Sequence, residues 1–325
     1  MITNLGAVLA LTAVLGAPPA QPDAGTKLPG TDARFGVDMT GRPVQLGSYS
    51  VFTNGRPPQQ NWAWSPAKRK FVKAEGPVTV SPGGQWQAEL RQRRGPAEPV
   101  TVRFTDRKSG RETDVELPVP PDPRNGDMPL HTLWPTWSPD GSRLLLNVFA
   151  SGNEPRSAGV VLVEVPALEA RFVRIEKALI TVGGFQWTRD GDGLVVRWGK
   201  NGKSSIRQYD LTGAVKRTWH VRGRPVPHGL GTFSPSGRRF VTACTSLEKS
   251  ACVWDTATGK AVTRIKIAFS PVWGPVLGWY DEKHLLAPVR DGIGVVDLKG
   301  RAVETLVKVG KKQHLYPWFD ARAKS

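Results

Sequence analysis

The sequence contains one stretch that decides its fold, Trp134-Pro-Thr-Trp-Ser-Pro-Asp-Gly-Ser-Arg-Leu-Leu-Leu-Asn-Val-Phe149. The stretch predicts two short strands joined by a tight turn. Its central residues, Ser138-Pro-Asp-Gly141, are those that a type I turn favours, with a side-chain acceptor first, proline second and glycine last. Leu144, Leu145, Leu146 and Val148 then form a nearly continuous apolar run, which is typical of a strand covered on both faces.

The same hairpin recurs along the chain. Its copies lie at 78–90, 134–149, 185–198, 232–244 and 276–289, and their first turn residues are Ser81, Ser138, Thr188, Ser234 and Tyr280. These turn residues are 57, 50, 46 and 46 positions apart, which is the spacing of a structural repeat. The copies at 185 and 276 have lost the Ser-Pro pair and keep only the spacing.

A second hairpin falls between these copies, so each repeat supplies four antiparallel strands. A small sheet of this kind cannot bury both faces alone, and stacking several around an axis solves the problem. The sequence therefore predicts an all-β fold, a single β-propeller with six four-stranded blades. Five complete blades are expected at 78–117, 134–175, 185–219, 232–265 and 276–307. Residues 49–75 and 313–319 are expected to pair as a composite closing blade made from both ends of the chain, and seven blades is the alternative.

The repeat also resembles a known family. Trp137-Ser-Pro-Asp-Gly141 followed by an apolar strand is similar to the repeat of TolB-type, WD-like β-propellers, and Val253-Trp-Asp255 resembles the Trp-Asp pair of WD repeats. The resemblance covers residues 49–319. It implies a scaffold and binding role more than any particular chemistry.

The first residues differ from the rest in composition. Leu5-Gly-Ala-Val-Leu-Ala-Leu-Thr-Ala-Val-Leu15 is an uncharged apolar run with the length of a signal-peptide core. Residues 1–25 are therefore predicted to be a signal peptide or an N-terminal membrane anchor, with a disordered apolar N-terminus as the alternative. We expect a linker at 26–48, the propeller at 49–319 and a tail at 320–325. The protein is expected to be exported, either secreted or tethered by an uncleaved N-terminal segment.

The chain has two cysteines, Cys244 and Cys252, one at each end of a predicted hairpin loop. This placement brings their Cα atoms within disulfide range. In an oxidising compartment such a pair forms a disulfide, whereas two unrelated buried thiols are the alternative.

The charge balance favours polyanionic surroundings, because 45 Lys+Arg against 28 Asp+Glu give a formal charge of +17. The basic runs at 68–70, 91–94, 107–108 and 216–217 are spread over both ends of the predicted propeller. This distribution favours a generally basic surface over one focused groove. For an exported monomer the expected partner is a protein or an anionic cell-envelope polymer, with some peripheral membrane association. Nucleic acid is not expected, since most of the 12 Trp lie at predicted core positions.

The sequence shows no motif of a known catalytic or metal centre. It has no Gly-x-Ser-x-Gly elbow, no His-Glu-x-x-His and no Gly-x-Gly-x-x-Gly before a helix. We therefore expect a binding module without enzymatic activity, cofactor or metal. One alternative is a propeller enzyme, a lyase or glycan-active hydrolase, with its site at the channel mouth. The other is a cytoplasmic nucleic-acid or protein-interaction scaffold.

Propeller ligands usually bind at the channel mouth, on loops that join one blade to the next and the second strand to the third. The candidate binding residues in these loops are Arg124, His131, Arg222, Arg224, His228, Trp273, Lys311, Lys312 and His314. Cations beside aromatic and imidazole groups suit an anionic or sugar-containing ligand. The alternative is that they are ordinary solvated loop residues.

Overall fold

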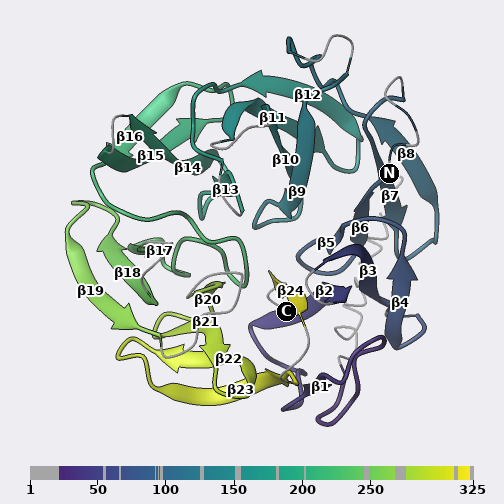
Figure 1. Cartoon of the computed structure of the whole chain (residues 1–325), viewed down its shortest axis with the longest axis vertical. Helices are drawn as coiled ribbons and strands as arrows, with labels where there is room; N and C mark the ends of the chain where they lie inside the picture. Colours follow the sequence, from purple (N-terminus) through teal and green to yellow (C-terminus); the bar gives the residue numbers. More distant parts are fainter. Residues whose placement is uncertain are drawn as a thin grey trace, which may run out of the picture.

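The fold was obtained as a computed structural model. It describes residues 22–53, 56–65, 67–91, 93, 95, 98–124, 128–150, 155–180, 183–200, 203–244, 249–267, 276–310 and 314–322. Within these ranges the chain forms antiparallel sheets and no helix, so no helix there could cross a membrane. Six sheets stand as blades around a central axis (Figure 1). The protein is therefore a six-bladed β-propeller, which confirms the predicted fold class.

Five blades follow one another in sequence order. The first two contain β5 (Val78–Val80), β6 (Trp86–Leu90), β7 (Thr101–Asp106), β8 (Glu112–Glu116), β9 (His131–Trp137), β10 (Arg143–Ala150), β11 (Arg156–Glu164) and β12 (Glu169–Arg174). The third contains β13 (Gln186–Trp187), β14 (Gly193–Lys200), β15 (Lys203–Asp210) and β16 (Val215–Trp219). The fourth and fifth contain β17 (Arg239–Ala243), β18 (Ser250–Asp255), β19 (Ala261–Lys266), β20 (Gly278–Trp279), β21 (His284–Val289), β22 (Gly292–Asp297) and β23 (Ala302–Lys308).

The sixth blade is built from both ends of the chain, as predicted. Its strands are, from the axis outward, β24 (His314–Ala321), β2 (Val44–Thr53), β3 (Arg56–Ser65) and β4 (Lys70–Ala74). Figure 1 shows β24 in yellow beside β2 in purple, close to the axis. Their register runs from Val44 opposite Ala321 to Phe52 opposite His314. This pairing closes the ring of blades.

The N-terminal segment is more ordered than the predicted linker at 26–48. The short strand β1 (Arg34–Phe35) pairs with the outer strand β23 of the fifth blade, and β2 already begins at Val44. Phe35 is almost fully buried, so β1 covers the edge of that blade with an apolar contact. A two-residue strand has no periodicity, and for that reason its pairing was not visible in the sequence.

The fourth blade departs from the others at its inner position. There a single bridge joins Phe233 to Phe240, and the residues just before it take another path. Gly229 N donates to Phe319 O (2.7 Å), and Leu230 N donates to Trp279 O (2.9 Å). These bonds hold the segment 226–232, which we call the channel segment, between the inner strands β20 and β24.

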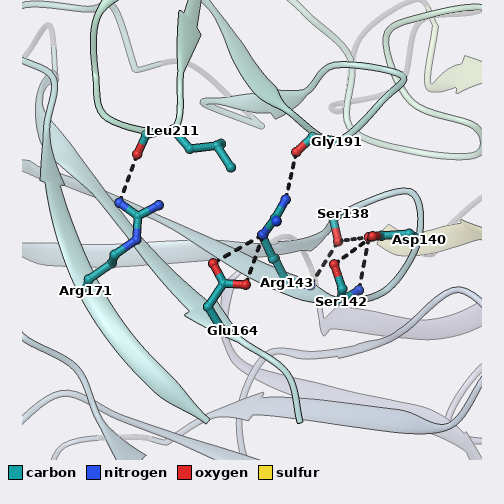
Figure 2. A network of polar contacts seen from close by, with 8 residues as sticks. All are labelled: Ser138, Asp140, Ser142, Arg143, Glu164, Arg171, Gly191 and Leu211. Carbon is teal, nitrogen blue, oxygen red and sulfur yellow. Dashed lines mark hydrogen bonds and ion pairs between the residues drawn. The ribbon is translucent and has the colours of Figure 1, made fainter. Parts of the chain in front are cut away.

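The Ser-Pro-Asp-Gly turn is held by its own side chains (Figure 2). Ser138 Oγ donates to Asp140 Oδ1 (2.6 Å), while the same carboxylate accepts from Ser142 N (3.1 Å) and Ser142 Oγ (2.7 Å). Arg143 then links the turn to the next blade, because it pairs with Glu164 and donates to Gly191 O (3.3 Å). The repeated motif therefore fixes the turn and its distance from the neighbouring blade.

The two cysteines form a disulfide in the fourth blade, with Cα atoms 5.4 Å apart and a sequence separation of 8. Closing a loop of this size contributes about 2.5 kcal/mol in the chain-entropy description. We expect Cys244→Ala/Cys252→Ala to lower the free energy of unfolding by about 2–3 kcal/mol in denaturant titrations. A reductant should destabilise the wild type by a similar amount and leave the double variant unchanged. Equal stability with and without the disulfide would contradict this.

Candidate functional site

A cavity of about 590 Å³ lies at one end of the central channel, among the turns that follow the inner strands. Each of the first five blades contributes the residue after its first turn position. These residues are Pro82, Pro139, Arg189, Pro235 and Asp281, which we call the turn ring. The sixth blade contributes the end of β24 and the loop before β2, residues 318–322 and 41–43. The repeat therefore places equivalent positions around one opening.

The wall of the cavity is rich in aromatic side chains. The aromatic lining residues are Trp137, Trp187, Phe233, Tyr280, Trp318 and Phe319. The channel segment also contributes Pro227 and Gly229 to Thr232 to the lining. A volume of this size, with an apolar wall and a few polar groups, is typical of ligand-binding sites.

Among the described residues, five charged ones line the cavity, Arg42, Arg189, Asp281, Asp320 and Arg322. Three of them hold their neighbours at the rim. Arg42 forms an ion pair with Glu304, Arg189 Nε donates to Pro235 O (3.1 Å), and Arg322 Nη2 donates to Met39 O (3.0 Å). Asp281 Oδ1 accepts from the backbone N of Lys283 (2.7 Å) and His284 (2.9 Å). These four side chains are therefore engaged within the protein.

Asp320 is different, because its Oδ2 has no hydrogen-bond partner among the described residues. Asp320 and Trp318 lie on the same face of β24, since alternate residues of a strand point the same way. Oδ2 packs against the Cα position of Gly47, where a methyl group would come within 2.1 Å of it. The exposed part of Asp320 lines the cavity. Burial raises the pKa of this carboxyl well above its usual value.

The cation that acts on Asp320 is Arg107, from the turn after β7. It opposes the effect of burial on the Asp320 pKa, but its guanidinium donates to Gly84 O (3.0 Å) and to Trp64 O. Its own burial lowers the pKa of Arg107 to about 10. Arg107 was expected to belong to a solvated basic run, and that expectation is wrong: the side chain reaches inward to tie the first blade to the sixth.

His228 lies beneath the cavity on the channel segment. Its ring centre is 4.7 Å from that of Trp318, and its Nδ1 has no hydrogen-bond partner among the described residues. Burial, with a smaller contribution from the nearby Arg224, lowers the pKa of His228 to about 3. The imidazole is therefore neutral across the physiological range.

Of the predicted binding residues whose side chains the structure describes, Arg124, His131, Arg222, Arg224 and His228, none lines this cavity. Arg124 is exposed and paired with Asp122, and His131 begins β9 and stacks on Phe149 at 5.8 Å. The structure brings Arg222, Arg224 and His228 onto one segment, where Arg224 and His228 interact electrostatically. Trp273, Lys311 and Lys312 lie outside the described residues, as does the side chain of His314. Binding by these residues at the opposite channel mouth remains a prediction.

The turn ring did leave a signal in the sequence. The copies at 185 and 276 lack the Ser-Pro pair, and the position that is proline elsewhere is Arg189 in one and Asp281 in the other. A charged residue at a position that is otherwise proline is a sequence signal for this end of the channel, where both residues line the cavity. Among the described residues no group of three His, Cys, Asp or Glu side chains is placed to hold a metal ion.

Asp320→Asn is expected to stabilise the protein at neutral pH. Because the folded pKa is raised, the native state binds the proton more tightly than the unfolded chain, and the wild type loses stability as pH rises through this range. The amide removes that loss, by about 1.4 kcal/mol for each unit of pKa shift. Denaturant titrations should show the variant above the wild type at pH 7 and equal to it near pH 3.

Asp114→Asn is the matched control. Asp114 lies on the outer strand β8, and its Oδ1 accepts a hydrogen bond from Arg103 Nε of β7 (2.8 Å). This hydrogen bond lowers the pKa of Asp114. Its removal should therefore weaken the protein slightly at neutral pH, with the opposite sign to Asp320→Asn. A neutral-pH loss of stability in Asp320→Asn would contradict the prediction.

The chain was compared with known proteins. No family model matches the sequence, and no curated protein matches it. Among solved structures, TolB from Acinetobacter baumannii is 18% identical over 86% of this chain and 69% of that one, with a TM-score of 0.43. Hydrazine synthase from Kuenenia stuttgartiensis is 15% identical over 90% and 80%, with a TM-score of 0.44. The Dos1 propeller is 11% identical over 82% and 76%, with a TM-score of 0.48. The assignment as a six-bladed β-propeller rests on the sheet topology of the chain itself.

Proposed function

We propose that the protein is a non-enzymatic binding β-propeller of the cell envelope, whose turn-end cavity holds a short segment of a partner protein. The observation that carries the proposal is the turn ring. Five equivalent turn positions and the end of β24 converge on a single cavity of about 590 Å³. A ring of this kind offers contacts from all six blades to one inserted segment.

The lining favours a peptide segment over a highly polar ligand. Aromatic side chains and the prolines of the turn ring supply flat apolar surface, on which extended or proline-containing peptides dock. Four of the five described charged lining residues form ion pairs or hydrogen bonds within the protein, so they do not need a polar ligand as a partner. What remains is a preformed apolar surface that needs little rearrangement to bind.

The disulfide supports an extracytoplasmic location for this function, because bonds of this kind persist in oxidising compartments. The formal charge of +17 would also hold the protein near anionic envelope components. Thiol labelling of protein isolated without reductant tests the location. We expect no reactive thiol, and two reactive thiols per chain would reject export.

Site-specific photocrosslinking tests the cavity as the binding site. Pro139→p-benzoylphenylalanine places the probe on the turn ring, where a type I turn accepts most residues. The matched control carries the same probe at Val262, which is exposed on the outer strand β19. We expect one discrete protein adduct from position 139, lost when Pro235→Trp fills the cavity, and none from position 262. Equal labelling at both positions, no adduct, or an adduct with a polymer would refute the proposal.

A further inference from the structure

We propose that the cavity recognises a cationic group of its occupant, a guanidinium or a primary ammonium, and that Asp320 is the residue that binds it. This deepens the proposed function, since the cation would belong to the inserted segment. The inference rests on Asp320, the charged lining residue whose buried Oδ2 has no hydrogen-bond partner among the described residues.

The first step is the cost of leaving this carboxylate alone. An ionised carboxylate out of water is unfavourable unless it is paired and hydrogen-bonded. Folding satisfies the other acid of the cavity, Asp281, with two backbone N–H groups of its own turn. Asp320 receives no such support, although its position on β24 is fixed by the pairing with Gln45 of β2. Oδ2 itself is shut against Gly47, so a cation in the cavity would pair with the carboxylate from the side that lines the cavity.

The second step is the surroundings of the carboxylate. Trp318 lies on the same face of β24, and Trp137, Trp187 and Tyr280 also line the cavity. Aromatic faces attract guanidinium and ammonium groups and add to a charge pair in a desolvated site. The faces of the same rings repel an anion. A cation is therefore the charge that both the carboxylate and the wall prefer.

The third step is the set of charges that face Asp320. Arg107 acts on it from the turn after β7, and His228 on the channel segment is neutral in the folded state. Arg42, Arg189 and Arg322 line the cavity and are held by Glu304, Pro235 O and Met39 O. The strand β2 that packs beneath it has no charged residue. Asp320 is thus the acid of the cavity that has no hydrogen bond to its Oδ2 among the described residues.

The test uses two probes of nearly equal shape, N-acetyl-arginine methylamide and its neutral isostere N-acetyl-citrulline methylamide. Binding to the full chain is followed through tryptophan fluorescence and calorimetry. We expect the wild type to bind the arginine probe at least about tenfold more tightly, as for a charge pair formed in a desolvated site. The preference should grow as pH rises and the carboxyl ionises, with proton release that calorimetry detects in buffers of different ionisation enthalpy.

Asp320→Asn should reduce the preference to about equal binding of the two probes and abolish proton release, without changing the citrulline affinity by more than about twofold. Asp114→Asn, an acid on the outer strand β8, is the control and should keep the wild-type preference. Equal binding of both probes by the wild type, binding of neither, or an unchanged preference in Asp320→Asn would overturn the proposal. The wild-type comparison stands even if the variant does not fold.

The two proposals fail in different ways. A protein crosslink at position 139 without any arginine preference would reject Asp320 as the cation site and leave the binding cavity intact. Absence of the crosslink together with absence of probe binding would reject both.

Discussion

A chain that ends at residue 313, before β24, is expected not to fold into a stable propeller. Removing β24 leaves β2 with an unpaired edge along eight residue pairs and takes the buried Leu315 and Phe319 out of the core. Each of these side chains contributes about 2–5 kcal/mol when buried, and small domains have only about 5–15 kcal/mol in total. The loss therefore exceeds what the remaining five blades can offset. Circular dichroism and size-exclusion chromatography should show an aggregated or largely unfolded protein.

The matched control ends at Arg322 and keeps every residue of β24. It also keeps the hydrogen bond that Arg322 N donates to Pro43 O (2.9 Å). It should unfold like the full chain. A synthetic peptide of residues 314–322 provides the converse experiment, because an added strand can complete an open sheet edge. We expect it to restore a cooperative unfolding transition to the truncated chain. Folding of the truncated chain without the peptide would show that closure is not needed.

The blades could be predicted because their signals are local. Each carries a turn at a regular interval. Apolar runs such as Leu144 to Leu146 predict a strand covered on both faces, and these three residues are fully buried in the structure. The composite blade was also predictable, because five complete repeats left one unpaired piece at each end of the chain. The ends of the strands were harder to predict. The closing blade was expected to start at residue 49, but β2 begins at Val44, because its first residues pair with a strand almost three hundred positions away.

The cavity could not be predicted in the same way. Its position depends on the channel segment, whose path is set by backbone bonds to Phe319 and Trp279 in other blades and leaves no periodic trace in the sequence. Asp320 was expected to lie in the C-terminal tail at 320–325. Its burial follows from the register with β2 and from the missing side chain at Gly47. The burial of Asp320 therefore depends on packing between residues far apart in the sequence, which the residue type alone does not predict.

His228 is expected to make the protein sensitive to acid. Burial lowers its pKa in the folded state to about 3, whereas the unfolded chain takes up the proton near pH 6.5. Between these two values the unfolded state binds more protons, so stability is lost as pH falls from about 6.5 towards 3. The full effect amounts to about 5 kcal/mol, and roughly 3 kcal/mol of it falls between pH 7 and pH 4. Few single side chains contribute a larger pH dependence.

His228→Phe isolates this effect. Phenylalanine keeps a flat ring against Trp318 and abandons no hydrogen bond at Nδ1, which has no partner among the described residues. Denaturant titrations should show variant and wild type within about 1 kcal/mol at pH 7. At pH 4 the variant should be more stable by about 3 kcal/mol. His220→Phe, at an exposed position just before the same segment, is the matched control and should follow the wild type at both pH values. Parallel loss of stability in His228→Phe and wild type would show that groups other than His228 cause the acid sensitivity, and would contradict the prediction.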